Sequence, residues 1–207
     1  YPKAVSTLEQ SLAITKELHG TEHLEVATSL NNLGLIHKTQ GNYLKAEKAY
    51  KLALSIAEKQ KSSGNQIAGT LNNLAGVCAI RGDYKNAEMY YQQALGIFEK
   101  QWRPDQKNLA ATLYMLGQLY MQTGEPNKAE PLMNRSLDIR EKVYGNNHPK
   151  TVVLQISLGM LLGQIGNYIE AEQMLMQALH SSEDVFGRNH PYTAVANNNL
   201  GEVYRVI

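Results

Sequence analysis

The chain has 207 residues, of which 20 are Lys or Arg and 19 are Asp or Glu, so its formal net charge is +1. Nucleic-acid-binding proteins and proteins of acidic membrane surfaces usually carry a basic excess, so we expect neither partner. Hydrophobic residues make up 43% of the chain, which is enough for a continuous core. No apolar run is long enough for membrane insertion. The single Cys78 excludes an internal disulfide and fits a reducing compartment, so we expect a cytoplasmic protein.

The sequence repeats itself with a nearly constant period. A Gly recurs at positions 41, 82, 124 and 166, and an Ala-Glu pair follows five residues after each of these glycines. A third ladder shares this period, which predicts a repeat architecture instead of one globular core. In this ladder a Leu precedes a small residue, with spacings of 41, 42, 42 and 42, at Leu33-Gly34, Leu74-Ala75, Leu116-Gly117, Leu158-Gly159 and Leu200-Gly201.

Taken in chain order, residues 1–18 supply only the second helix of a repeat. Four whole repeats follow at about 25–64, 66–105, 108–147 and 150–189, and residues 192–207 supply only a first helix. In the first whole repeat Val26, Leu30 and Leu33 have the spacing of one helical face. A Gly-Asn or Gly-Asp step then ends the first helix, because Gly adopts the left-handed conformation that closes a helix. Neither terminus offers a polar capping helix, so we expect a fragment of a longer protein.

Small residues mark the places where the two helices of a repeat are expected to cross. Gly34 of the first helix and Ala46 of the second leave room for close approach of the two backbones. A hairpin of this kind cannot bury both of its apolar faces alone, so we expect each repeat to stack on the next.

These residues resemble the tetratricopeptide repeat, whose pattern runs Leu-Gly, Tyr, Ala, a large residue and Ala. The matches read Leu116-Gly117, Tyr120, Ala129, Met133 and Ser136 in one repeat, and Leu74-Ala75, Cys78, Ala87, Tyr91 and Ala94 in another. The period is about eight residues longer than the usual 34, which corresponds to about one extra turn per helix. This long repeat is similar to that of kinesin light chains, as are the connecting segments 145–149 and 187–191. The resemblance implies an all-α fold, a single right-handed superhelix of antiparallel helix pairs.

In a stack of this type the first helices line a concave face, and their inward positions form the expected peptide-binding groove. Pairs of Asn recur there, and an amide offers both a donor and an acceptor to an extended peptide backbone. The resemblance implies peptide contacts for Asn32, Asn73 and Asn199, while the alternative is that these amides bond neighbouring helices. The expected groove residues are Asn31, Asn32, Lys38, Asn72, Asn73, Tyr114, Met115, Gln118, Met121, Gln122, Ser157, Met160, Gln164, Asn198, Asn199 and Arg205.

The middle repeats replace the Asn pairs with Tyr114, Met115, Ile156 and Ser157. With Met121 and Met160, the large apolar residues among these would make a deformable floor, because the Met thioether is flexible and polarisable. Our hypothesis is that a central apolar or aromatic peptide residue anchors there, and the alternative is that some of these residues are ordinary core. Only Lys38 and Arg205 give this face positive charge, so we do not expect a clamp for a terminal carboxylate.

The remaining candidate groups do not indicate an enzyme. His23, His148 and His190 share one repeat position on separate connecting segments, too far apart for a common metal ion. We therefore expect them to cap helices or to pack in the turns. Cys78 falls in a packing position. No catalytic residue, metal site or cofactor site is expected. The sequence predicts an adaptor or scaffold that binds a protein or peptide partner, and the alternative is a structural scaffold that self-associates without a peptide ligand.

Overall fold

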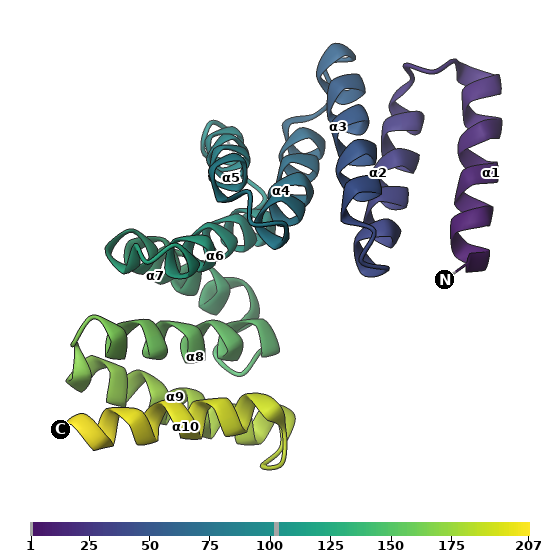
Figure 1. Ribbon diagram of the computed structural model, residues 1–207. Helices are drawn as coiled ribbons and strands as arrows, with labels where there is room; N and C mark the ends of the chain where they lie inside the picture. Colours follow the sequence, from purple (N-terminus) through teal and green to yellow (C-terminus); the bar gives the residue numbers. More distant parts are fainter. Residues whose placement is uncertain (1, 102–103) are drawn as a thin grey trace. The chain divides into compact units, whose positions relative to one another are not determined.

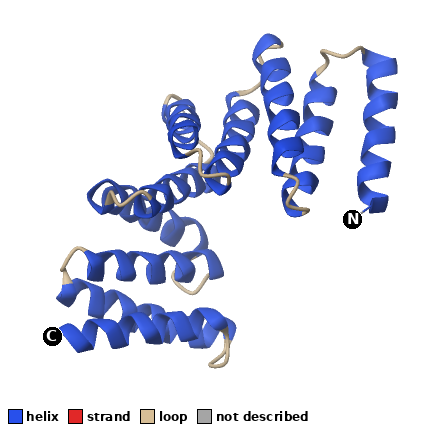
Figure 2. Ribbon diagram, in the orientation of Figure 1, coloured by secondary structure: helices blue, strands red, loops and turns tan. Residues whose placement is uncertain are grey.

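The computed structural model describes residues 2–101 and 104–207, and within these residues it contains helices and loops but no strand (Figures 1 and 2). None of the described helices is long and apolar enough to cross a membrane. The helices are α1 (Pro2–His19), α2 (Leu24–Thr39), α3 (Tyr43–Lys59), α4 (Gly64–Ile80), α5 (Tyr84–Glu99), α6 (Gln106–Gln122), α7 (Pro126–Tyr144), α8 (Pro149–Gln164), α9 (Tyr168–Phe186) and α10 (Pro191–Val206).

The chain divides into two compact units, which we call unit 1 (Tyr1–Asp105) and unit 2 (Gln106–Ile207). Unit 1 contains α1 to α5 and unit 2 contains α6 to α10, and inside each unit every helix packs against the next one along the chain. The most extensive packing joins α2 to α3, α4 to α5, α6 to α7 and α8 to α9, which form antiparallel pairs (Figure 1). The expected all-α architecture of antiparallel helix pairs is confirmed. We call α2, α4, α6, α8 and α10 the first helices of the repeats.

A glycine with positive φ follows the end of α2, α4, α6 and α8. Gly41 has φ 76°, and its neighbour Asn42 donates its backbone N–H to the carbonyl of His37 at 2.8 Å. Gly82 has φ 79° and serves in the same way after α4. A side chain is unfavourable in this conformation, whereas Gly adopts it without steric cost. The Gly ladder of the sequence therefore corresponds to the predicted helix ends.

The two helices of a pair cross at the small residue of the Leu ladder. A Cβ atom on Gly34 would lie 2.6 Å from a ring carbon of Tyr50, and one on Gly159 would lie 2.6 Å from Cγ of Leu175. Gly117 meets Met133 in the same way. Each large residue of a second helix thus fills the space that a glycine leaves on the first helix. The expected close approach at Gly34 is confirmed.

Clusters of buried apolar residues join a helix pair to a neighbouring helix in each unit. In unit 1, Leu12 of α1 packs with Leu30 of α2 and Ile56 of α3. In unit 2, Ile156 of α8 packs with Ala178 of α9 and Ala196 of α10. Ile156 is only 4% exposed. Our expectation that Ile156 belongs to a groove floor is therefore wrong, because this side chain is part of the core between α8, α9 and α10.

Three of the first helices begin at a His cap, as the sequence predicts. The Nδ1 atoms of His23, His148 and His190 accept the backbone N–H of the residue two positions later, at 3.3, 3.1 and 3.2 Å. Each imidazole also stacks on the ring four residues earlier, with centroids 4.7, 4.4 and 4.7 Å apart. The cap satisfies one of the free N–H groups at the helix start. The stack holds the ring in place for this bond.

Candidate binding surface

Each first helix keeps one row of residues out of the core. The row has the spacing i, i+4, i+7 and i+11, which places its members on one helical face. All of its members are half-buried or exposed. We call this row the open stripe. It consists of Thr28, Asn32, Leu35 and Thr39 on α2; Gly69, Asn73, Gly76 and Ile80 on α4; Ala111, Met115, Gln118 and Gln122 on α6; Val153, Ser157, Met160 and Gln164 on α8; and Val195, Asn199, Glu202 and Val206 on α10.

The expected groove residues fall on the open stripe or directly beside it. Those on the stripe are Asn32, Asn73, Met115, Gln118, Gln122, Ser157, Met160, Gln164 and Asn199. The others precede a stripe residue by one position, and all of them are half-buried or exposed: Asn31, Lys38, Asn72, Tyr114, Met121, Asn198 and Arg205. Two of these neighbouring residues, Asn31 and Tyr114, form a hydrogen bond to the next first helix, so their side chains point toward that helix.

Those two hydrogen bonds follow one rule. In unit 1, Nδ2 of Asn73 donates to Oδ1 of Asn31 at 3.1 Å. In unit 2, Oγ of Ser157 lies 3.3 Å from the hydroxyl of Tyr114. In both, the second stripe residue of one first helix bonds the residue beside the stripe on the preceding first helix. Some polar side chains of this face therefore bond to each other and not to a ligand.

Asn199 is the exception to this rule. It is the second stripe residue of α10, and the position that should bond it on α8 is occupied by Ile156, which offers no polar atom. Nδ2 of Asn199 is buried and has no hydrogen-bond partner among the residues that the structure describes. A buried donor without an acceptor is destabilising, because it has lost its water without gaining a bond. An acceptor supplied by a ligand would remove this cost.

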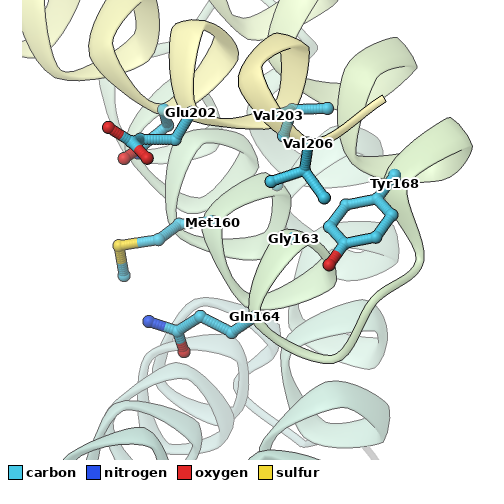
Figure 3. Close-up of a pocket in the computed structure, with 9 residues that line it drawn as sticks. Met160, Gly163, Gln164, Tyr168, Glu202, Val203 and Val206 are labelled. Atoms are coloured by element: carbon cyan, nitrogen blue, oxygen red, sulfur yellow. The ribbon is translucent and has the colours of Figure 1, made fainter.

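Asn199 borders a pocket of about 340 Å³ between α8, α10 and the first residue of α9, which we call the Asn199 pocket. Its other lining residues are Gly159, Met160, Gly163, Gln164, Tyr168, Glu202, Val203 and Val206. In Figure 3, Met160 and Gln164 of α8 extend toward the same side as Glu202 of α10, and Tyr168 lies beside Val206 at the opposite side. Nε and Nη2 of Arg205 both bond Oε2 of Glu202, so that expected cation is already paired.

A second pocket of about 440 Å³ lies at the other end of α8, and we call it the Arg140 pocket. It is walled by aromatic rings and contains three cationic side chains, with no Asp or Glu among its lining residues. It includes two expected groove residues, Tyr114 and Met115. The lining residues are Lys107, Ala111, Tyr114, Met115, Arg140, Tyr144, Pro149, Lys150, Val153, Phe186 and Tyr192.

Arg140 is the buried cation of this pocket. Its side chain is only 6% exposed, its Nη1 donates to the carbonyl of Lys150 at 2.5 Å, and its Cζ lies 4.6 Å from the centroid of the Tyr114 ring. Burial lowers the pKa of the Arg140 guanidinium, and nearby Tyr114 and Tyr144 act in the opposite direction. Within residues 2–101 and 104–207, no carboxylate forms an ion pair with Arg140. A guanidinium remains charged at neutral pH, so the pocket holds a desolvated positive charge without a counter-charge.

Two lysines add to this charge. Nζ of Lys107 and Nζ of Lys150 lie 5.8 and 5.4 Å from the centroid of the Tyr144 ring. These three cations are not predicted from the sequence, because they lie outside the first-helix positions near the Leu ladder. Arg140 comes from a second helix, Lys150 follows a His cap, and Lys107 lies in the first turn of α6. The expectation that Lys38 and Arg205 alone charge this face is therefore wrong for unit 2.

The hairpins, their shared period and the open stripe define a helical repeat protein that presents one face of its first helices to solvent. A family model for tetratricopeptide repeats matches residues 1–59, 66–142 and 108–184. The chain belongs to the tetratricopeptide repeat family, whose domains typically serve as protein-interaction modules and not as catalysts. A search of curated proteins finds no match.

Solved structures with the same fold include kinesin light chain-like proteins. BtubC (BKLC) from P. vanneervenii is 20% identical with a TM-score of 0.83, over 99% of this chain and 83% of that one. A putative kinesin light chain of Podospora anserina, with nearly identical TPR-like repeats, is 22% identical with a TM-score of 0.73, over 89% and 88%. YrrB, described as having an unusual peptide-binding site, is 18% identical with a TM-score of 0.66, over 94% and 82%. The predicted resemblance to this long type of repeat is confirmed.

Proposed function

We propose that unit 2 binds an extended peptide segment of a partner protein along the open stripe of α8. An acidic side chain or a terminal carboxylate enters the Arg140 pocket, and an apolar side chain enters the Asn199 pocket. The observation that carries this proposal is Arg140, a buried guanidinium without a carboxylate partner in a pocket of aromatic walls.

The chemistry of the Arg140 pocket favours a carboxylate. Arg binds carboxylates through paired, charge-assisted hydrogen bonds, and Lys107 and Lys150 strengthen the attraction for an anion. Tyr114, Tyr144 and Tyr192 offer ring surface to an apolar or aromatic neighbour of the acidic residue. A ligand with both features would compensate the buried charge and cover the exposed rings.

The two pockets are placed so that one short segment reaches both. Val153 borders the Arg140 pocket, Met160 borders the Asn199 pocket, and both belong to the open stripe of α8. Seven helical residues span about 10 Å, a distance that about three residues of an extended peptide cover. A peptide carbonyl that enters the Asn199 pocket would supply the acceptor that the buried Nδ2 of Asn199 lacks. YrrB, a protein of the same fold, has an unusual peptide-binding site, which agrees with this use.

The ligand class can be tested by selection from a display library of random dodecapeptides against the full chain. We expect the recovered peptides to be enriched in Asp or Glu next to an aromatic or large apolar residue. Their affinity should fall by about 2–5 kcal/mol in Arg140→Met, the usual cost of removing one partner of a buried charge pair. Fluorescence anisotropy with a labelled peptide measures this loss.

Lys142→Met is the matched control, because it removes one positive charge from the same helix at an exposed position outside the pocket. It should leave the affinity nearly unchanged. Recovered peptides without acidic residues, or equal affinity for Arg140→Met, would overturn the proposal. If no peptide is recovered and the chain forms concentration-dependent oligomers in analytical ultracentrifugation, the self-associating scaffold is the better interpretation.

A further inference from the structure

The turn between α1 and α2 brings three potential metal ligands together. His19, His23 and Glu25 each offer one ligand atom, and these atoms all lie within 4.8 Å of one another. Nε2 of His19 is 3.2 Å from Oε2 of Glu25, and the two imidazole rings stack with centroids 4.7 Å apart. All three residues are exposed, so their side chains can adjust. This turn belongs to unit 1, whereas the peptide site proposed above belongs to unit 2.

The corresponding turns of unit 2 show which part of this arrangement is peculiar to the first one. The positions of His19, His23 and Glu25 are occupied by Tyr144, His148 and Lys150 before α8, and by Phe186, His190 and Tyr192 before α10. The stacked ring and the His cap are common to all three turns. Two imidazoles beside a carboxylate occur in the first turn alone among these three. The ring stack therefore belongs to the repeat, but the ligand set does not.

We propose that His19, His23 and Glu25 form a binding site for one divalent transition-metal cation of the Zn²⁺ type. Imidazole nitrogen and carboxylate oxygen are ligands that Zn²⁺ prefers, at bond lengths of about 2.0–2.2 Å. Ligand atoms of a tetrahedral ion at these bond lengths lie about 3.5 Å apart. Because the two imidazoles are stacked, one ring has to rotate out of the stack before both nitrogens can point at the same ion, and the exposure of both side chains leaves room for this rotation. Three protein ligands leave a coordination position for water or for a side chain of a partner.

Metal binding and helix capping compete for the His23 ring. Nδ1 of His23 accepts the backbone N–H of Glu25 at 3.3 Å, which requires the neutral ring to carry its proton on Nε2. Coordination through Nε2 moves that proton to Nδ1, and coordination through Nδ1 uses the acceptor itself. In either case the N–H of Glu25 loses its partner. We therefore expect the NMR signal of the Glu25 backbone amide to shift when the ion binds.

The test is a titration of the full chain with zinc chloride, followed by isothermal calorimetry and by ¹H–¹⁵N NMR of the Glu25 amide. We expect one ion per chain and a shift of that amide. The variant His19→Tyr with Glu25→Lys reproduces the turn at 144–150. It should bind Zn²⁺ at least about tenfold more weakly, since even loss of an outer-shell partner of a metal site has about this effect. His23→Asn keeps a capping side chain and should also lose the ion.

The control is His148→Asn, which alters the equivalent cap in unit 2 and should leave zinc affinity unchanged. Circular dichroism of each variant separates loss of the ligands from loss of folding. The proposal is overturned if the full chain does not bind zinc, if the double variant binds as tightly as the original, or if His148→Asn weakens binding as much as His23→Asn. A calorimetric signal without a change at the Glu25 amide would also contradict it, because the ion would then be bound elsewhere.

Discussion

Units 1 and 2 have the same helical hairpins but different open surfaces. In unit 1 the stripes of α2 and α4 carry Asn32, Asn73 and two glycines, and the amide of Asn73 is bonded to Asn31. In unit 2 the stripes border two pockets, one cationic and aromatic and the other with an unpaired buried amide. The shared scaffold thus leaves the surface positions free to vary. We therefore expect the two units to contribute unequally to binding.

The largest expected difference between the units follows from placing negative charge on the open stripe of unit 2. Met115→Glu together with Met160→Glu should lower peptide affinity by about a hundredfold or more, since like charges at an interface cost several kcal/mol. The carboxylate of the first substitution would also lie beside Arg140 and compete with the ligand. Anisotropy with a selected peptide measures the loss.

Leu35→Glu is the counterpart in unit 1, at an exposed stripe position. It should change the affinity little. Retained binding by the double variant, or an equal loss in Leu35→Glu, would remove the distinction between the units. Loss of helicity in the double variant would show instead that these methionines are part of the core.

The units should also differ in their response to alkaline pH. Burial raises the pKa of Tyr50 and of Tyr91 to about 12, from the ordinary value of 10.0, and both belong to unit 1. The folded state then holds these protons more tightly than the unfolded chain. This stabilisation is complete below about pH 10 and is lost as the pH rises toward about 12, and it amounts to up to about 3 kcal/mol per tyrosine.

Tyr50→Phe should therefore move the alkaline unfolding midpoint, followed by circular dichroism, to higher pH. The hydroxyl of Tyr50 is buried and bonds to no group in the described part of the chain, so this substitution should cost little at neutral pH. Tyr192→Phe, at an exposed position in unit 2, is the control and should leave the midpoint in place. An unchanged midpoint in Tyr50→Phe would contradict the prediction.

The His caps test what the two units share. His148→Ala removes the acceptor for the Lys150 N–H and should cost about 1 kcal/mol in urea denaturation, whereas His148→Asn should keep most of the stability. The pair His23→Ala and His23→Asn should behave alike in unit 1. A cost in one unit alone would show that the caps are not equivalent.

The smallest expected effect is a change in the free energy of unfolding when Asn199 is substituted. Asn199→Leu removes a buried donor without a partner and should raise the free energy of unfolding by up to about 1 kcal/mol, while weakening peptide binding. Asn73→Leu breaks the bond to Asn31 and should lower stability by a similar amount. If Asn199→Leu lowers the free energy of unfolding as much as Asn73→Leu does, then Asn199 has an acceptor in the folded protein.

Repetition explains why most of the fold could be predicted from the sequence. Gly41 and Gly82 mark helix ends, Gly34 marks a crossing, and His148 marks a helix start, because each type of residue recurs in the same backbone setting. The Arg140 pocket could not be found in this way. Its residues come from all the helices from α6 to α10, and they do not recur together in other repeats. Ile156 was misplaced for a related reason, since its partners Ala178 and Ala196 are distant in sequence. The short spacing of His19, His23 and Glu25 is present in the sequence, but the repeat pattern predicts a role for His23 alone, as a cap or turn residue.

The rule that links neighbouring stripes means that a side chain outside the binding surface can govern what the surface recognises. Asn199 keeps a vacant donor because the core residue Ile156 stands where Asn31 or Tyr114 stands in other repeats. A residue with a hydrogen-bond acceptor at position 156 would bond Nδ2 of Asn199, and that donor would then no longer be free to bind a ligand. Specificity in this chain can therefore change through substitutions one repeat away, without alteration of a single contacting atom.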